Sequence, residues 1–273
     1  MPELPEVEVT RRGLAPHLEG RVVTAVTFRR SGLRWPFPTE LVQQLPDCVI
    51  RTTGRRGKYL LLEFDQGTLI IHLGMSGHLR LLPAAAQAGV HDHFDLVIGS
   101  QLMRLTDPRR FGAVLWHGRE QGPVVNHPLL ASLGVEPFDY AFTGEFLYQK
   151  SRNRTADIKQ TLLSGKIVVG VGNIYASESL FLAGINPKTQ ARRIGRQRYE
   201  KLAAAIRTVL ASAIEQGGSS LRDFSGINGQ PGYFQLVCNV YGRQGEACRI
   251  CGTTVSQIKQ GQRSTFYCVN CQK

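Results

Sequence analysis

The sequence predicts an α+β protein: an N-terminal antiparallel β-sandwich with flanking helices, then a helical domain, then a C-terminal β-hairpin that holds a metal ion. Short β-type segments dominate residues 21–117, helical periodicity dominates residues 144–216, and two Cys-x2-Cys pairs close the chain. Many short strands separated by turn residues are typical of an antiparallel sandwich or barrel. At 273 residues the chain is long enough for more than one domain.

The N-terminal region begins with one helix and continues as strands. The helix is predicted over Pro5–Leu18, because proline is favourable in a first turn and the apolar positions share one face. Seven segments with β-type residues follow, bounded by Gly, Pro and Asp; they are Arg21–Arg30, Tyr59–Phe64, Thr68–Leu73, His78–Leu82, His93–Ile98, Leu102–Thr106 and Ala113–Trp116.

The pattern becomes helical after the Gly- and Pro-rich stretch 118–144, which marks a domain boundary. Four helices are predicted, with Thr155 as the cap of the second; they are Gly144–Arg152, Thr155–Leu163, Asn173–Leu182 and Arg196–Gln216. We therefore expect domains over residues 2–130, 131–230 and 236–273.

The charge balance indicates a polyanionic partner. The chain has 33 Lys and Arg against 21 Asp and Glu, a formal net charge of +12, and such a balance is typical of nucleic-acid binding. An anionic membrane surface would also fit, but no long basic amphipathic stretch is present. Acidic residues occupy the place of a secretory signal, and the longest apolar runs are far short of a membrane span. A cytoplasmic protein is expected.

The cysteine spacing predicts a metal site. Four cysteines form two pairs separated by 16 residues, the spacing of a zinc ribbon in which two turns present sulfurs to a tetrahedral Zn²⁺; they are Cys248, Cys251, Cys268 and Cys271. Two disulfides or a redox pair are the alternative, which a reducing cytosol disfavours. Cys48 and Cys238 lie outside the pattern and are expected to be buried small hydrophobic residues.

The chain start Met1-Pro2-Glu3 suggests covalent chemistry. Removal of Met1 would leave Pro2 with a secondary amine that could attack an electrophilic carbon and form an iminium. Glu3 could supply or accept a proton. The alternative is that Pro2 only stiffens the chain start.

Polar clusters lie at predicted loops or strand ends, at residues 55–58, 91–93, 107–111 and 152–154. Each alone is typical of a solvated loop, but four of them on a strongly basic chain favour phosphate contacts. The glycines of Val169–Asn173 would let backbone approach a phosphate at a helix N-terminus, with a plain turn as the alternative. His91 and His93 could instead bind a metal, although no third ligand lies nearby in an obvious pattern.

Five motifs together resemble one family. They are Met1–Glu8, His72–Gly77, Thr106–Gly112, Val169–Glu178 and the four-cysteine ribbon. In order and spacing they resemble the bacterial formamidopyrimidine-DNA glycosylases, also called 8-oxoguanine DNA glycosylases, over the whole chain. The resemblance implies a β-sandwich with flanking helices, a helix–two-turns–helix domain, a zinc finger built from a β-hairpin, and damaged double-stranded DNA as the partner.

The resemblance also implies roles in catalysis. Pro2 would attack C1′ of the damaged nucleotide and displace the oxidised base, while Glu3 would assist opening of the sugar ring. Lys58 would contact the lesion phosphate and assist β-elimination. Arg263, at the hairpin of the ribbon, would grip the same backbone and assist δ-elimination, so that strand cleavage on both sides of the sugar leaves a gap.

Contacts with DNA are implied as well. A base must leave the stack before C1′ can be attacked, and the void must be filled. Met75, Arg109 and Phe111 match the three void-filling side chains of the family. Phosphate contacts are implied for His91, Asn173, Asn153 and Arg154.

One of these positions departs from the family, which often has a lysine where this chain has Asn153. Because Arg152 and Arg154 flank it, which of the three contacts phosphate stays open. The segment Gly217–Tyr233 is expected to read the oxidised base. A monomer is expected.

Two other functions remain open from the sequence. One is a related glycosylase for oxidised pyrimidines, against which the Met75, Arg109 and Phe111 trio argues. The other is a non-enzymatic zinc-ribbon protein that binds DNA, which would leave Pro2 and Glu3 unexplained.

Overall fold

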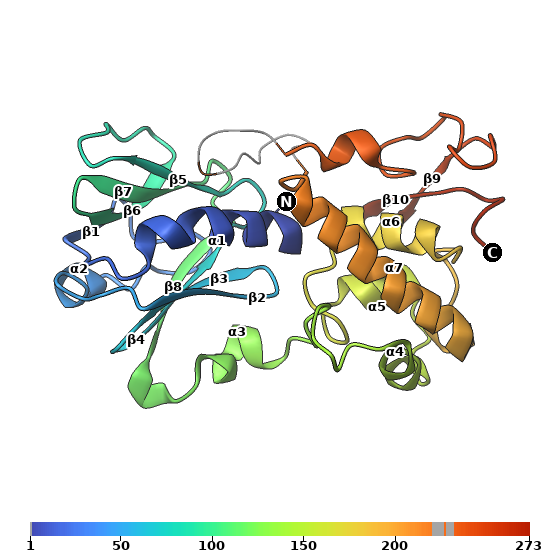
Figure 1. Ribbon diagram of the computed structural model, residues 1–273, viewed down its shortest axis with the longest axis horizontal. Helices are drawn as coiled ribbons and strands as arrows, with labels where there is room; N and C mark the ends of the chain where they lie inside the picture. The colour runs from blue at the N-terminus through green and yellow to red at the C-terminus, as the bar shows by residue number, and fades with distance from the viewer. Residues whose placement is uncertain (1, 220–226, 228–231) are drawn as a thin grey trace. The chain divides into compact units, whose positions relative to one another are not determined.

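The computed structural model describes residues 2–219, 227 and 232–273, which Figure 1 traces from the N-terminus to the C-terminus. They form two compact units. One comprises Met1–Ala131 with Gln216–Tyr233, and the other comprises Ser132–Glu215 with Phe234–Lys273. Most of the segment expected to read the oxidised base lies outside the described residues.

Two four-stranded antiparallel sheets form the first unit, with strand orders β2-β3-β4-β8 and β1-β6-β7-β5. The strands are β1 (Ala25–Phe28), β2 (Thr52–Arg56), β3 (Tyr59–Phe64), β4 (Gly67–His72), β5 (His78–Pro83), β6 (Asp92–Ile98), β7 (Gln101–Thr106) and β8 (Ala113–Gly118). Apolar side chains of both sheets and of α1 (Leu4–Leu18), among them Leu14, Leu62 and Phe94, share one core. The predicted β-sandwich with a flanking helix is confirmed.

Short helical segments connect the strands and helices. They are α2 (Leu41–Gln44), α3 (Pro128–Ala131) and the 3-10 turns η1 (Arg119–Gln121), η2 (Val124–Asn126), η3 (Ala191–Arg193) and η4 (Phe234–Val237).

The N-terminus of α1 is capped by two nearby glutamates, Glu3 and Glu6. Pro5 stands in the first turn, where its missing N–H costs no helical hydrogen bond. The backbone N–H of Glu3 donates to Oε2 of Glu6 at 2.7 Å. The other carboxylate oxygen of Glu6 accepts the N–H of Ser219 at 2.8 Å. One buried carboxylate therefore binds the first turn of the chain to the segment that returns to this unit after residue 215.

Glu8 joins α1 to the edge strand β2. Its carboxylate, only 8% exposed, accepts hydrogen bonds from Arg11 and Arg12 of the same helix and from Arg55 of β2. Burial raises the pKa of Glu8, but the hydrogen bonds from the arginines outweigh burial and lower that pKa to about 2.

The second unit combines the helices with the C-terminal hairpin. Its elements are α4 (Gly144–Ser151), α5 (Ile158–Leu163), α6 (Asn173–Leu182), α7 (Arg196–Glu215), β9 (Ser256–Gln260) and β10 (Arg263–Tyr267). The helices bury a core that includes Tyr175, Tyr199 and Leu210. A smaller apolar cluster around Phe181 and Val255 supports the cysteine ribbon. The predicted hairpin between the two cysteine pairs is confirmed.

Several elements differ from the sequence-based expectation. The strand predicted over Arg21–Arg30 is confined to Ala25–Phe28. Thr52–Arg56, for which no strand was predicted, forms the edge strand β2. Its polar composition gave no strand signal, because an edge strand needs few apolar residues. The helix expected from Thr155 begins at Ile158, with Asp157 as its N-cap. The preceding residues are extended because they pair with residues 190–191, through the Asp157–Gln190 bridge.

The two cysteines outside the ribbon differ from each other. Cys238 is buried, as expected, but Cys48 is only half-buried, with its Sγ 3.2 Å from the carbonyl of Gln44. Among the described residues, no helix has the length and apolar character needed to cross a bilayer.

Because the folded-state pKa of Glu8 lies below its ordinary value of 4.5, this carboxylate stabilises the fold fully above about pH 5 and loses that effect as the pH falls toward about 2. We expect Glu8→Gln to lower the Tm at pH 7 and to flatten the fall in Tm between pH 5 and pH 2. Calorimetry across this range measures both. The exposed Glu40→Gln is the control, and parallel Tm profiles for wild type and Glu8→Gln would contradict the assignment.

Candidate active site and zinc centre

Strand pairing collects predicted site residues at one end of the first sheet. His72 ends β4 and lies opposite Tyr59, the first residue of β3, and opposite the first residue of β8. Lys58 stands just before β3, Met75 lies in the turn after β4, and Phe111 lies just before β8. Three segments distant in sequence therefore meet because their strands are neighbours in register.

The second sheet places further candidates at the same end. Thr106, the last residue of β7, pairs with the first residues of β5 and β6. His91 precedes β6 and Arg109 lies in the turn after β7. The connections 73–77 and 107–112 both cross from one sheet to the other here, so the two sheets share this end.

The direction of α1 brings the chain start toward this end. Arg11 donates to the carbonyl of Thr53 at 3.3 Å, and Glu8 accepts from Arg55 at 3.2 Å. Moving toward the start of α1 therefore means moving toward the end of β2. The residues before α1 point toward the β2–β3 turn, which carries Lys58.

The predicted nucleophile and its acid are buried at the chain start. Pro2 and Glu3 both have little exposed surface, and Glu3 is only 2% exposed. Lys58 is half-buried. With Met1 removed, a buried Pro2 amine next to a buried carboxyl group would suit covalent attack and proton transfer, because low solvent access strengthens electrostatic interactions.

The two apolar candidates for void filling have exposed side chains. Met75 is 37% exposed and Phe111 is 46% exposed. The guanidinium of Arg109 lies over the Phe111 ring, 5.3 Å from its centroid. Exposed apolar side chains beside an arginine suit insertion between stacked bases.

His72 is a site residue to which the sequence analysis gave no role of its own. Its Nδ1 accepts the N–H of Gly74 at 3.1 Å, and its ring centroid lies 4.8 Å from that of Tyr59. Burial first, and then the positive charges of Lys58 and Arg34, lower the pKa of His72 to about 4. The ring is therefore neutral at pH 7, and because Nδ1 accepts from Gly74, the ring proton lies on Nε2, which can donate a hydrogen bond. Aligning β3 and β4 as a hairpin would have placed His72 opposite Tyr59, next to Lys58, and so marked His72 as a candidate site residue.

In the second unit, the hairpin that carries Arg263 is fastened to two helices. Asn173, the first residue of α6, donates to the carbonyl of Ser264 at 3.1 Å. Lys159 of α5, which is fully buried, donates to the same carbonyl at 3.0 Å and to the hydroxyl of the next residue at 2.7 Å. The adjacent Arg263 is exposed. The structure thus brings two of the predicted residues, Asn173 and Arg263, into one neighbourhood.

The cluster at residues 152–154 is partly engaged within the protein. Arg152 donates to the carbonyl of Ile194 at 2.7 Å and lies 3.9 Å from the ring centroid of Tyr148. Asn153 is exposed, and Arg154 is half-buried with its Nε 3.3 Å from the carbonyl of Lys150. Asn153 and Arg154 are therefore better placed than Arg152 to meet a phosphate.

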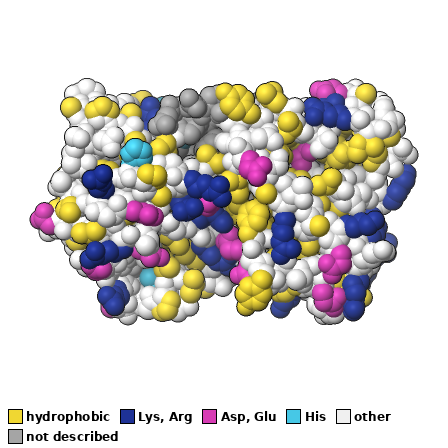
Figure 2. Space-filling model, in the orientation of Figure 1, with side chains coloured by type: hydrophobic (Ala, Val, Ile, Leu, Met, Phe, Trp, Pro, Cys, Tyr) yellow, Lys and Arg dark blue, Asp and Glu magenta, His cyan; other side chains and the backbone are white. Residues whose placement is uncertain are grey.

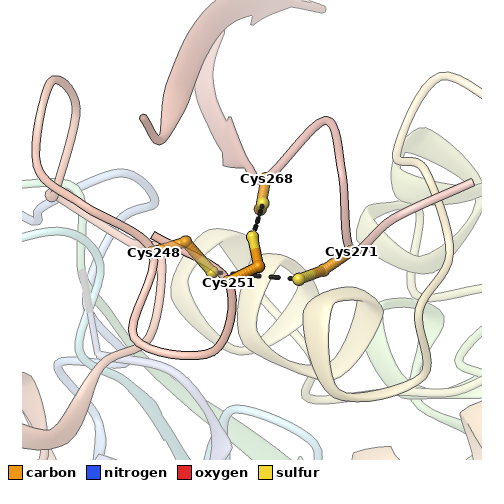
Figure 3. Close-up of side chains that lie close together, drawn as sticks. All are labelled: Cys248, Cys251, Cys268 and Cys271. Atoms are coloured by element: carbon orange, nitrogen blue, oxygen red, sulfur yellow. Dashed lines mark hydrogen bonds between the residues drawn. The ribbon is translucent and has the colours of Figure 1, made fainter. Parts of the chain in front are cut away.

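The four cysteines of the ribbon converge on one point (Figure 3). All four sulfurs lie within 4.8 Å of one another; they belong to Cys248, Cys251, Cys268 and Cys271. The separations between Cys251 and Cys268 and between Cys248 and Cys271 are 3.5 Å and 3.9 Å, far longer than the ~2.05 Å of a disulfide. Zn–S bonds of ~2.3 Å in a tetrahedron place sulfurs ~3.8 Å apart. The geometry fits Zn²⁺ and excludes the disulfide alternative.

The two histidines near residue 92 do not form a comparable group in the described part of the chain. Nε2 of His93 lies 3.0 Å from the carbonyl of Asp107, while His91 is exposed. His93 is therefore structural, and His91 is available at the surface.

Positive charge is spread over both units. Figure 2 shows Lys and Arg side chains over the face in view, interspersed with Asp and Glu. The net charge of +12 is therefore not confined to one patch on this face.

Comparison with known proteins identifies the family. Residues 1–114 match the formamidopyrimidine-DNA glycosylase N-terminal domain, residues 133–225 match the formamidopyrimidine-DNA glycosylase H2TH domain, and residues 245–273 match the zinc finger found in FPG and IleRS. Proteins named formamidopyrimidine-DNA glycosylase from Janthinobacterium sp. (strain Marseille) and Herminiimonas arsenicoxydans are 68% and 67% identical over the full length of both chains.

Solved structures agree with this assignment. A Lactococcus lactis FPG in complex with a Fapy-dG containing DNA is similar with a TM-score of 0.90 and 34% identity, over 99% of this chain and 100% of that one. The Lactococcus lactis Fpg with an abasic site containing DNA has a TM-score of 0.91 and 34% identity over 99% of each chain. The motifs, the three matched domains and the fold agree, and the chain belongs to the formamidopyrimidine-DNA glycosylase family.

Proposed function

We propose that this chain is a base-excision DNA repair glycosylase that removes oxidised purines, 8-oxoguanine and formamidopyrimidines, from duplex DNA and then cleaves the abasic site. The observation that carries the proposal is the direction of α1, which points Pro2 and Glu3 toward the end of the sandwich where Lys58 lies. Relatives of the same fold were solved with DNA containing Fapy-dG or an abasic site.

In the first step, the amine of Pro2 attacks C1′ of the flipped nucleotide. The bond from C1′ to the base breaks, and the base leaves with its bonding electron pair and takes up the proton that the Pro2 nitrogen releases. Glu3 then donates a proton to the ring oxygen as the C1′–O4′ bond breaks, and the nitrogen lone pair forms the iminium.

Strand cleavage follows from the iminium, which acidifies the C2′ proton. Lys58 contacts the lesion phosphate and assists β-elimination, in which the C2′ proton is lost and the 3′ phosphate leaves. Arg263 grips the same backbone and assists δ-elimination, in which the 5′ phosphate leaves. Hydrolysis of the iminium releases the protein and leaves a gap in one strand.

Base flipping costs a few kcal/mol, which contacts in the opened duplex must offset. We assign Met75 and Phe111 as apolar wedges, and Arg109 as the side chain that pairs with the orphaned cytosine. Four further residues hold the DNA backbone: His91, Asn153, Arg154 and Asn173.

The four cysteines hold one Zn²⁺, whose binding fixes the hairpin at which Arg263 lies. We assign the domains to residues 2–130, 131–230 and 236–273. The enzyme acts as a monomer, because one chain supplies every residue in this scheme. Free cysteines suit the reducing cytoplasm, where we place it.

Pro2→Gly should reduce borohydride trapping on 8-oxoguanine DNA at least tenfold. The substitution replaces a ring-held secondary amine by a flexible primary amine, which loses orientation at C1′. Denaturing gels after borohydride treatment measure the covalent protein–DNA adduct. Pro5→Ala is the matched control, because it removes a nearby proline and leaves Pro2 as the N-terminal residue. An unchanged adduct yield for Pro2→Gly would remove the N-terminal amine from the mechanism, and no adduct with wild type would favour a DNA-binding protein without catalysis.

Glu3→Gln should lose base excision while keeping part of the cleavage at preformed abasic sites, because an intact nucleotide depends on Glu3 to open its sugar ring, whereas an abasic sugar is already partly in the open aldehyde form. Single-turnover assays on duplexes with 8-oxoguanine opposite cytosine, and with an abasic site, separate the two steps. Full activity of Glu3→Gln on 8-oxoguanine would contradict its role. Faster wild-type removal of thymine glycol than of 8-oxoguanine would favour an oxidised-pyrimidine glycosylase.

Cys248→Ser, or removal of zinc by a chelator, should weaken DNA binding at least tenfold while leaving the Tm of the β-sandwich nearly unchanged. The ribbon belongs to the second unit and the sandwich has its own core. Metal analysis, gel shifts and calorimetry together measure these effects. Cys48→Ser is the control, because that cysteine lies outside the ribbon. Wild-type DNA binding by a zinc-free protein would contradict the assignment.

A further inference from the structure

The two turns that carry the void-filling side chains contact each other directly. Gly74 has a φ of +63°, and a Cβ on it would lie 2.4 Å from the carbonyl carbon of Phe111, so only glycine fits there. The turn around Met75 and the turn around Phe111 therefore pack backbone against backbone at this point.

A buried carboxylate fastens these two turns. Asp107, fully buried, accepts the hydroxyl of Ser76 through Oδ1 at 2.8 Å and the N–H of Gly112 through Oδ2 at 2.8 Å. The Ser76 oxygen in turn accepts the N–H of Arg109 at 3.2 Å. Each oxygen of the carboxylate thus serves a different turn.

The backbone of Asp107 also contacts the segment at the start of β6, which carries His91 and His93. Its N–H donates to the carbonyl of His91 at 2.9 Å, and its own carbonyl lies 3.0 Å from Nε2 of His93. One residue therefore contacts the segments that carry Met75, Arg109 with Phe111, and His91.

We propose that Asp107, acting through Ser76, is a positioning residue that holds Met75, Arg109 and Phe111 in one fixed arrangement for insertion into the opened duplex; this rests on the void-filling role under Proposed function. Hydrogen bonds to a buried carboxylate are strong and directional. They fix the backbone of the two turns from which these exposed side chains project, so less conformational freedom is lost when the wedges enter the DNA stack.

The step that depends on this arrangement is base flipping rather than covalent attack. An abasic site in single-stranded DNA has no stacked base to remove and no partner strand to leave unpaired. Asp107 and Ser76 therefore matter for 8-oxoguanine in a duplex, and their loss leaves reaction at a single-stranded abasic site unchanged.

Ser76→Ala tests this directly, because it removes the hydroxyl that links the turns and leaves the Asp107–Gly112 bond. We expect base excision from an 8-oxoguanine:C duplex to slow on the order of tenfold. The fluorescence rise of 2-aminopurine placed beside the lesion, which reports unstacking, should slow in parallel. Borohydride trapping on a single-stranded abasic oligonucleotide should match wild type. Asp107→Asn, which loses the charge and one acceptor, should slow duplex excision further.

Thr53→Val is the matched control, because Thr53 is also buried and its hydroxyl also donates to a carboxylate, that of Glu19, at 2.7 Å in the same unit. It should behave as wild type. Wild-type excision and fluorescence for Ser76→Ala would overturn the inference alone. So would equal losses in Ser76→Ala and Thr53→Val, or parallel losses on the duplex and the single strand. A wild-type protein that neither excises nor traps would overturn the proposed function and this inference together.

Discussion

The carboxylate of Glu6 holds the start of the chain in place, and the rest of the proposed chemistry depends on that position. It binds the N–H of Glu3 at 2.7 Å and the N–H of Ser219 at 2.8 Å. An N-terminal amine is ordinarily among the most mobile groups of a protein. Under the proposed mechanism, the Pro2 amine precedes a capped and buried helix by two residues, so that the fold would orient the amine before substrate binds and lower the entropic cost of attack.

The sandwich and the zinc hairpin position candidate site residues in different ways. The sandwich gathers Lys58, Met75 and Phe111 at one end by strand register alone. The hairpin instead presents Arg263 from a short two-stranded sheet that could not be stable by itself. Bonds from buried Lys159 and from Asn173, together with the cysteine ligands, supply the stability that the hairpin lacks.

The sequence predicted those parts of the fold whose signals are local. Cysteine spacing predicted the zinc site and its hairpin, and short β-type segments bounded by Gly, Pro and Asp predicted most strands. The edge strand β2 was missed because its exposed side chains are polar. The bond between Ser76 and Asp107 spans 31 residues and arises from strand register, which no local pattern encodes. The charge environment of His72 likewise requires the pairing of β3 with β4.

The most direct test of the central claim is to locate the bond between protein and DNA. Wild-type protein trapped by borohydride on an 8-oxoguanine duplex can be digested, and the peptide that carries the sugar remnant can be sequenced by mass spectrometry. We expect the remnant on the amine of Pro2 in a peptide that lacks Met1. A remnant on a lysine such as Lys58, or an active protein that retains Met1, would contradict it.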